Sequence, residues 1–263
     1  MFKPLRVRHL VGIGFLCASC SAFAADEFSA VAGIVRFTGT IPTRTFADND
    51  GRHRPLFEVS RRNSGLPQAV VFLQAAVSAP SSTELPLPAR ISQVDGEFVP
   101  RVVAVRAGQV VSISNEEPAN HNVRSVTTTV ENLFNVMTPA EGKYEHAIKR
   151  EREGRPIQLL CDIHPWMVGW IYVFEHDLFT VTDEDGGFRI PNVPAGVYRV
   201  VVQQPDGGLI AEGDLSVKAT NEVQIAIDFT ESHLARKSHG KIVVESSATE
   251  TPKREESAGA PKQ

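Results

Sequence analysis

The segment that most constrains the fold of this chain is residues 161–167, which place a thiol, an imidazole and a thioether at three-residue spacing. These groups belong to Cys161, His164 and Met167, and the segment directly follows an apolar run of strand length at residues 156–160. Thiolate, imidazole and thioether are the ligand types that select copper, and one more imidazole would complete a trigonal site with a long axial methionine. Such a site needs a rigid frame that brings a second loop to the same place.

His121 supplies the second imidazole. It lies in residues 119–123, just after another strand-like run at residues 110–114. Because each segment follows a predicted strand, both can reach the same end of a β-sandwich, and we predict one copper ion per chain held by these four side chains. Zinc would accept the nitrogen and sulfur ligands, but a thioether is a poor zinc ligand. Five further histidines have no partner at metal-ligand spacing and are interpreted as surface residues: His53, His146, His176, His233 and His239.

Residues 1–24 are predicted to be a cleaved signal peptide. Lys3, Arg6 and Arg8 form a basic region, residues 10–18 are apolar but too short to span a bilayer, and residues 22–24 read Ala-Phe-Ala. A short membrane anchor, or a lipoprotein modified at Cys20, would be the alternatives. Since no later run is apolar for long enough to cross a membrane, we expect a soluble protein exported to a bacterial periplasm.

Loss of this leader would leave Cys161 as the only thiol, because Cys17 and Cys20 lie within it. A lone thiol in an oxidising compartment cannot form an internal disulfide, and an unprotected one is open to oxidation. A buried structural thiol is the alternative, but a metal-bound thiolate explains the residue better. A single cysteine also excludes a binuclear copper centre, which needs two.

Short runs rich in Val, Ile, Phe and Thr, broken by Gly, Pro and Asp, follow one another from Phe28 onward. They lack helical periodicity, and many short strands at close spacing imply an all-β sandwich or barrel of Greek-key type. Asp95-Gly96 predicts a tight hairpin turn within residues 91–99. Residues 102–105 and 110–113 are expected to form a second pair, and residues 46–68 an irregular loop.

A second, smaller β-sandwich is predicted for residues 177–230, where strand-like runs alternate with turns rich in Asp, Gly and Pro. After Glu231 the chain becomes charged and polar, so residues 231–263 are predicted to be a disordered tail. The predicted division is therefore a leader at 1–24, a metal-binding domain with an N-terminal β extension at 25–176, the second sandwich, and the tail.

Residues 102–123 contain the pattern V-x-x-G-x-x-V…N…H-N-V, which resembles the cupredoxins, the superfamily of plastocyanin and azurin. The loop Cys-x-x-His-Pro-Trp-Met is most similar to that of amicyanin, because Met follows His at a shorter spacing than in plastocyanins. The resemblance implies a type 1 (blue) copper centre with His121, Cys161 and His164 as equatorial ligands and Met167 as the axial ligand. It also implies that Asn122 braces the two loops. Asn120 stands where amicyanin has a proline.

The resemblance further implies a carrier of single electrons and not an enzyme. His164 would be the electron exit, inside an apolar patch to which Pro165 and Trp166 contribute. A c-type cytochrome or a dehydrogenase would dock there in a weak, transient contact with a monomer of this chain. The net charge of -4 argues against nucleic acid and anionic membranes as partners.

Residues 183–188 and 193–198 resemble the carboxypeptidase regulatory-like β-sandwich, with the pattern T-D-x-x-G-x-F followed by v-P-x-G-x-Y. Such prealbumin-like modules carry no catalytic residues and are similar in fold to carbohydrate-binding sandwiches. A second hypothesis therefore stays open: a periplasmic binding or scaffolding protein for a glycan or a protein, whose copper site stores metal, is structural or is silent. An oxidase would need further ligands at His-x-His spacing, which the sequence lacks.

Overall fold

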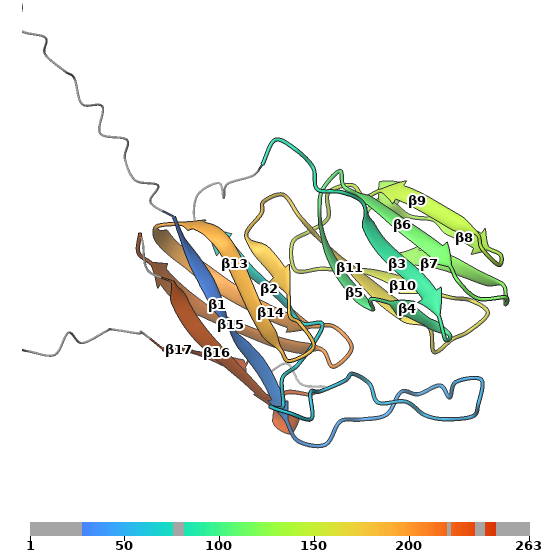
Figure 1. The fold of residues 1–263 in the computed structure, drawn as a ribbon, viewed down its shortest axis with the longest axis horizontal. Coiled ribbons are helices and arrows are strands. Elements are labelled where there is room, and N and C mark those ends of the chain that lie inside the picture. Colours follow the sequence, from blue (N-terminus) through green and yellow to red (C-terminus); the bar gives the residue numbers. More distant parts are fainter. Residues whose placement is uncertain (1–27, 76–81, 220–221, 235–239, 246–263) are drawn as a thin grey trace, which may run out of the picture.

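The computed structural model describes residues 28–75, 82–219, 222–234 and 240–245, and the regular structure within these ranges is almost entirely β-strand. The predicted all-β fold is confirmed. Within the described ranges the helical elements are two single turns of 3-10 helix, η1 (Val130–Asn132) and η2 (Glu231–His233). The strands form two modules that lie side by side (Figure 1).

The first of these, here called the metal-site module, consists of two sheets that enclose one apolar core. A five-stranded sheet has the order β5-β11-β10-β7-β8, and a four-stranded sheet has the order β4-β3-β6-β9. Ile91 and Ile113 from the second sheet pack against Val123, Leu159 and Ile171 from the first, all of them buried. The strands are β3 (Ala89–Val94), β4 (Glu97–Val99), β5 (Val102–Arg106), β6 (Val110–Asn115), β7 (His121–Val126), β8 (Asn135–Thr138), β9 (Lys143–Ala147), β10 (Ile157–Leu160) and β11 (Val168–Phe174).

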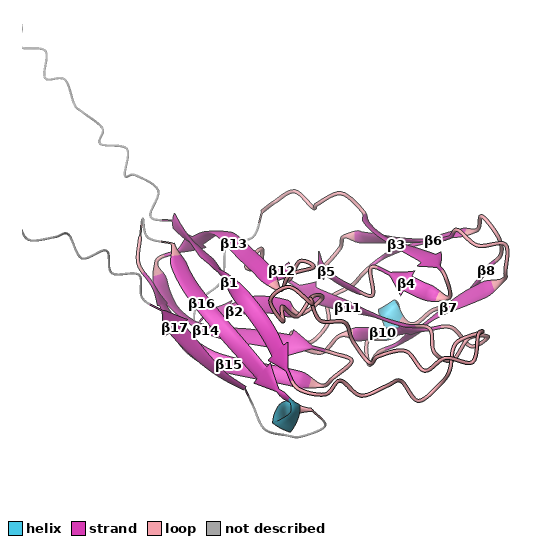
Figure 2. Ribbon diagram, turned by 60° about the horizontal axis from the view of Figure 1, so that its bottom comes forward, coloured by secondary structure: helices cyan, strands magenta, loops and turns pink. Residues whose placement is uncertain are grey.

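The second, here called the sandwich module, is one eight-stranded sheet of order β12-β2-β14-β15-β17-β16-β1-β13 that folds over its own core (Figure 2). Val31, Leu73, Ile190, Val200 and Ile227 from five of its strands are fully buried there. The strands are β1 (Phe28–Thr38), β2 (Val70–Ala75), β12 (Phe179–Val181), β13 (Gly187–Pro194), β14 (Gly196–Gln204), β15 (Leu209–Val217), β16 (Val223–Thr230) and β17 (Gly240–Glu245).

The structure divides the chain differently from the sequence prediction. β1 pairs with β13 in antiparallel and with β16 in parallel orientation, and β2 pairs with β12 and β14. These two strands therefore complete the sandwich module and are not an extension of the metal-binding domain, which is inserted between β2 and β12. The local sequence pattern of a strand does not indicate which distant strand it pairs with. The boundary predicted at residues 176–177 therefore relied on the change in sequence pattern there.

The predicted disordered tail is also corrected in part. β17 runs antiparallel to β16 and pairs with β15 at two positions. The run Ile242-Val243-Val244 consists of β-branched residues, which favour a strand even within a charged segment. The rest of the predicted tail beyond Leu234, and the predicted signal peptide, lie outside the described residues.

Two local predictions had opposite outcomes. The hairpin at Asp95-Gly96 is confirmed, with φ angles of 52° and 67° that fit a primed turn between β3 and β4. The expected pairing of residues 102–105 with 110–113 is wrong, because β5 pairs with β11 whereas β6 pairs with β3 and β9. The chain crosses between sheets at residues 106–109, where Gln109 Oε1 accepts the Arg106 N–H at 2.9 Å.

The two modules share a small apolar interface. Phe72 and Val201 of the sandwich module pack with Val102, Tyr172 and Phe174 of the metal-site module, all of them buried. Beside them Asp206 accepts hydrogen bonds from the Arg101 guanidinium at 2.7 and 2.8 Å and from the Trp170 indole N–H at 3.0 Å. Among the described residues, no helix has the length and apolar character needed to cross a membrane.

Candidate metal centre

The topology of the five-stranded sheet brings the two predicted loops to one end of the metal-site module. His121 is the first residue of β7, which is antiparallel to β10, and Cys161 directly follows the end of β10. Met167 directly precedes β11, the other neighbour of β10. The start of β7, the end of β10 and the start of β11 therefore meet at the same edge of the sheet.

Three donor atoms converge at this edge. The Nδ1 atoms of His121 and His164 lie 2.9 Å apart, and Cys161 Sγ lies 3.9 Å from the first and 3.7 Å from the second. With metal–nitrogen bonds of about 2.0 Å and metal–sulfur bonds of about 2.3 Å, these separations correspond to angles of roughly 90° to 130° at a shared ion. The residues present therefore fit a metal held in a trigonal set of two nitrogens and one sulfur.

Met167 lies at the base of the same loop and is fully buried, in the core that contains Cys161. Its N–H donates to the His164 carbonyl at 2.9 Å, and its carbonyl accepts the Cys161 N–H at 3.3 Å. These bonds close the loop into a compact turn, so that its first and last residues are held together. The structure thus places Met167 beside the donor cluster, and the assignment of its thioether as the axial ligand stays a prediction.

A polar network fixes the cysteine loop to β7 and β8. Asn122 Oδ1 accepts the Asp162 N–H at 2.7 Å, and Asn122 Nδ2 donates to the Asp162 carboxylate at 2.9 Å. Arg124 Nε and Asn135 Nδ2 donate to the same carboxylate at 2.7 and 3.1 Å. The Arg124 guanidinium beside Asp162 holds the pKa of that carboxyl below its usual range, so the network keeps its charge. Asn122 thus links the cysteine loop to β7, and its role as a brace of a copper site stays a prediction.

Replacing Asn122 tests that bracing. Because Asn122 is buried and its loss leaves the Asp162 N–H without this acceptor, we expect Asn122→Ala to lower the free energy of unfolding of the metal-free protein by about 1–3 kcal/mol. Asn135→Ala, which removes an exposed member of the same network, should cost less. Urea denaturation measures both. Equal losses for the two variants would contradict a bracing role specific to Asn122.

Glu117 is a site residue that the sequence did not reveal. Its Oε2 lies 2.6 Å from His121 Nε2, and its Oε1 accepts the Gly96 N–H from the β3–β4 turn at 2.6 Å. Since His121 Nδ1 faces the donor cluster, the N–H of the neutral ring lies on Nε2 and donates a hydrogen bond to the Glu117 carboxylate. A carboxylate in this place fixes the ring orientation and the tautomer of a metal-binding histidine. Its position four residues before His121 was the available signal, but loop carboxylates at such spacing are usually solvated.

Loss of that carboxylate should weaken metal binding. We expect Glu117→Ala to lower copper affinity about 10- to 100-fold, the usual range for such outer partners, and Glu117→Gln to lower it less, because the amide oxygen still accepts the Nε2 proton. Competition with a chelator measures the affinity. Glu116→Ala serves as the control, since that neighbouring carboxylate binds Ser92 and Ser114 instead. An unchanged affinity in Glu117→Ala would argue against this role.

His164 is the more exposed of the two histidines in the cluster. Burial lowers the pKa of His164, and the neighbouring His121 lowers it further, while Glu117 opposes the shift. The neutral imidazole, which is the form that binds a metal, is therefore favoured. The predicted docking residues border it: the Trp166 ring lies 5.1 Å from the His164 ring, Pro165 is exposed, and so is Ile163.

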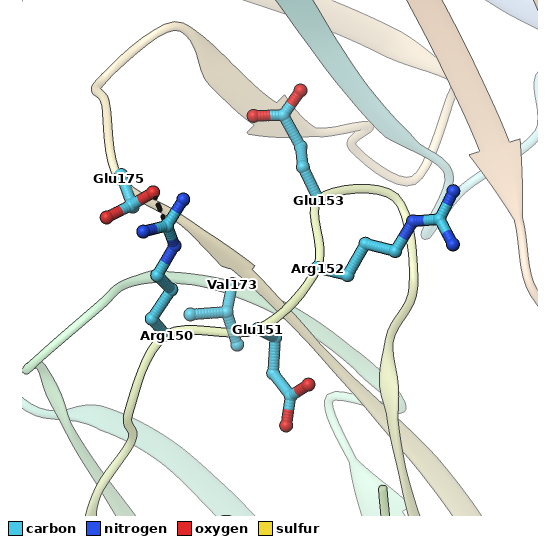
Figure 3. A pocket seen from close by; sticks show the side chains of 6 residues that line it. All are labelled: Arg150, Glu151, Arg152, Glu153, Val173 and Glu175. Atoms are coloured by element: carbon cyan, nitrogen blue, oxygen red, sulfur yellow. Dashed lines mark ion pairs between the residues drawn. The ribbon is translucent and has the colours of Figure 1, made fainter. Parts of the chain in front are cut away.

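A separate hollow lies at the end of the metal-site module opposite to the donor cluster. It is formed by residues just before β10 and by the end of β11 (Figure 3). Several of its charged side chains already have partners: Arg150 Nε lies 2.8 Å from Glu175, and Glu153 lies 3.0 Å from His176 Nε2. His176 accepts the Leu178 N–H on Nδ1 and is buried, so its interpretation as a surface residue was wrong. Within the described residues, the group able to hold a metal is His121, Cys161 and His164.

Comparisons with known proteins give matches of low similarity between part of this chain and solved structures. No protein-family profile matches the chain, and no curated protein matches it. Solved structures similar to part of it include a copper-containing nitrite reductase from Thermus scotoductus (22% identity, TM-score 0.31), a purple cupredoxin from Nitrosopumilus maritimus (25%, 0.29) and amicyanin from Paracoccus versutus (16%, 0.29). The match to the nitrite reductase covers 38% of this chain and 25% of that one, so this chain spans only a quarter of the nitrite reductase. The match to the purple cupredoxin covers 33% of this chain and 99% of that one, and the match to amicyanin covers 40% and 97%.

Proposed function

We propose that this chain is a mononuclear copper protein that carries single electrons between redox partners. The observation that supports this best is the convergence of His121 Nδ1, His164 Nδ1 and Cys161 Sγ within 3.9 Å of one another. Two imidazoles and one thiolate, with the Met167 thioether in the same loop as a weak axial ligand, form the donor set of type 1 electron-transfer copper. Copper bound there would alternate between Cu(II) and Cu(I).

The surrounding residues hold the donors in place before any metal arrives. Glu117 orients His121, Asn122 ties the cysteine loop to β7, and the bonds between Cys161, His164 and Met167 close that loop. A set fixed in this way rearranges little between oxidation states, which suits repeated uptake and release of an electron. Four protein ligands would also leave no open coordination position of the kind that catalytic metal sites keep. We therefore propose a carrier and not an enzyme.

The partner proposed here is a redox protein such as a c-type cytochrome or a dehydrogenase. His164 lies beside the exposed Pro165 and Ile163, so its ring can come close to a docked protein. A small apolar contact of this kind suits a brief encounter between redox proteins. The signal-peptide pattern of residues 1–24 supports the periplasm as the compartment.

Copper titration of the purified protein tests the proposal. We expect an intense visible absorption that saturates at one Cu(II) per chain, a reversible one-electron wave in voltammetry, and rapid reduction by a c-type cytochrome in stopped-flow mixing. Copper that binds without the absorption would point to a storage or structural site. An absorbing site that exchanges no electron with any partner on the millisecond to second scale would contradict the carrier function.

A further inference from the structure

A groove of about 330 Å³ lies between the two modules, next to the metal centre. One wall is a part of the long connection between β1 and β2, the blue trace below the metal-site module in Figure 1, which contributes Phe46 and Leu56. The other wall is the outer face of β10 and β11, with Leu160 and Trp170, and the metal loop closes one end with Trp166. The loop at residues 46–68, to which the sequence assigned no role, thus forms part of a site.

A single aromatic ring separates this groove from the metal centre. The rings of Trp166 and His164 have their centroids 5.1 Å apart and are tilted by 54°. His164 contributes its Nδ1 to the donor cluster. A molecule in contact with Trp166 would therefore lie one ring away from His164.

The charged side chains that border the groove bind one another. Arg44 Nη1 lies 2.5 Å from Glu97, and the Arg101 guanidinium makes two bonds to Asp206 at 2.7 and 2.8 Å. Asp206 also accepts the Trp170 indole N–H. Because these charges are already paired, the groove favours a ligand that carries none.

The rest of the lining is mostly apolar and includes three aromatic rings. Phe46 is 53% exposed, and Trp166 and Trp170 are partly exposed, so all three offer ring surface to a ligand. Aromatic rings pair with one another in offset or edge-to-face contact. Thr45 and Gln158 add a hydroxyl and an amide at the same groove, which can bind a ligand hydroxyl. A volume at the lower end of the usual range for ligand sites suits one ring or two fused rings.

We propose that this groove binds a neutral, planar aromatic molecule of the phenol or hydroquinone class, held by Phe46, Trp166 and Trp170. Phenols and hydroquinones are also aromatic molecules that give up single electrons. As a reductant, the bound molecule would give one electron to Cu(II), which becomes Cu(I), release one proton to water and leave as a phenoxyl or semiquinone radical. This step rests on the function proposed above, whereas binding itself does not. Both modules would take part in binding, because each supplies one wall of the groove.

The chain provides its own probe for this site. Its two tryptophans are Trp166 and Trp170, and both border the groove, so the intrinsic fluorescence reports on it. We expect methylhydroquinone, added under nitrogen to the metal-free full-length protein, to quench this fluorescence in a saturable way. Phe46→Ala should weaken binding roughly three- to tenfold, the value of one aromatic contact. Phe28→Ala, an exposed phenylalanine on β1, is the matched control and should bind as the unchanged protein does.

The outcomes separate the groove from the copper centre. Quenching that stays linear in ligand concentration, or a Phe46→Ala variant that binds as tightly as the control, would overturn the proposal. Saturable quenching by cellobiose and none by methylhydroquinone would overturn it as well, in favour of a sugar. Saturable binding of the aromatic molecule by a protein that forms no coloured copper site would refute the proposed function but not the groove as a binding site. A coloured copper site in a protein that does not bind the aromatic molecule would refute the groove proposal alone.

Discussion

Cys161→Ser is expected to abolish the intense visible absorption of the copper-loaded protein. That absorption requires the bond between copper and a thiolate sulfur, and Cys161 is the only cysteine among the described residues. A serine hydroxyl is nearly the same size but stays protonated at neutral pH and is a poor ligand for copper. Because loss of a partner outside the ligand set already costs up to about 100-fold in metal affinity, loss of this ligand should cost more. Absorption spectra and chelator competition measure the two effects.

Two comparisons make this result specific to the sulfur. Far-UV circular dichroism should show that Cys161→Ser keeps the fold, since the substitution hardly changes the volume of a buried side chain. Met167→Leu should keep the intense band, because the Cys161 sulfur remains, while its reduction potential changes. If Cys161→Ser stayed coloured, the colour would come from another site and the proposed centre would be wrong.

The individual strands could be predicted because period and turn chemistry are local properties. The run at residues 110–114 was expected to form a strand and lies in β6 (Val110–Asn115). Asp95-Gly96 forms the predicted turn because both residues adopt positive φ without large strain. The partners of the strands could not be predicted in the same way. β1 joins β13 and β16 across more than half of the chain, and only the packing of their shared core selects that arrangement.

In the candidate site too, features set by neighbouring residues could be predicted from the sequence, whereas contacts between distant segments could not. Thiol, imidazole and thioether spacing pointed to residues 161–167, and the structure brings His121 to that loop because β7 and β10 are neighbours. Glu117 and the groove beside Trp166 were missed for a different reason. Both depend on where a loop side chain or a distant segment comes to rest, and residue type at a given spacing does not encode this.

The largest effect on stability is expected from Phe174→Ala, at the boundary between the modules. Phe174 ends β11 in the metal-site module and is 1% exposed, with its ring 5.0 Å from that of Phe72 and stacked 4.5 Å from that of Phe179. Both partners belong to the sandwich module. Removal of a buried phenylalanine ring costs about 3–5 kcal/mol, since apolar contacts are lost and a cavity remains. Guanidinium denaturation followed by far-UV circular dichroism measures the loss.

The topology makes this substitution a test of whether the modules unfold as one. The metal-site module is inserted between β2 and β12, and Phe174 packs against a ring from each of these strands. If the interface couples the modules, Phe174→Ala should make them unfold at different guanidinium concentrations. The change in tryptophan fluorescence, which reports on the groove, would then no longer coincide with the loss of the strand signal in circular dichroism. Val197→Ala, at a 69% exposed position on β14, should change stability by less than about 0.5 kcal/mol and leave the two signals coincident. A Phe174→Ala variant no less stable than this control would show that this interface between the modules does not form in solution.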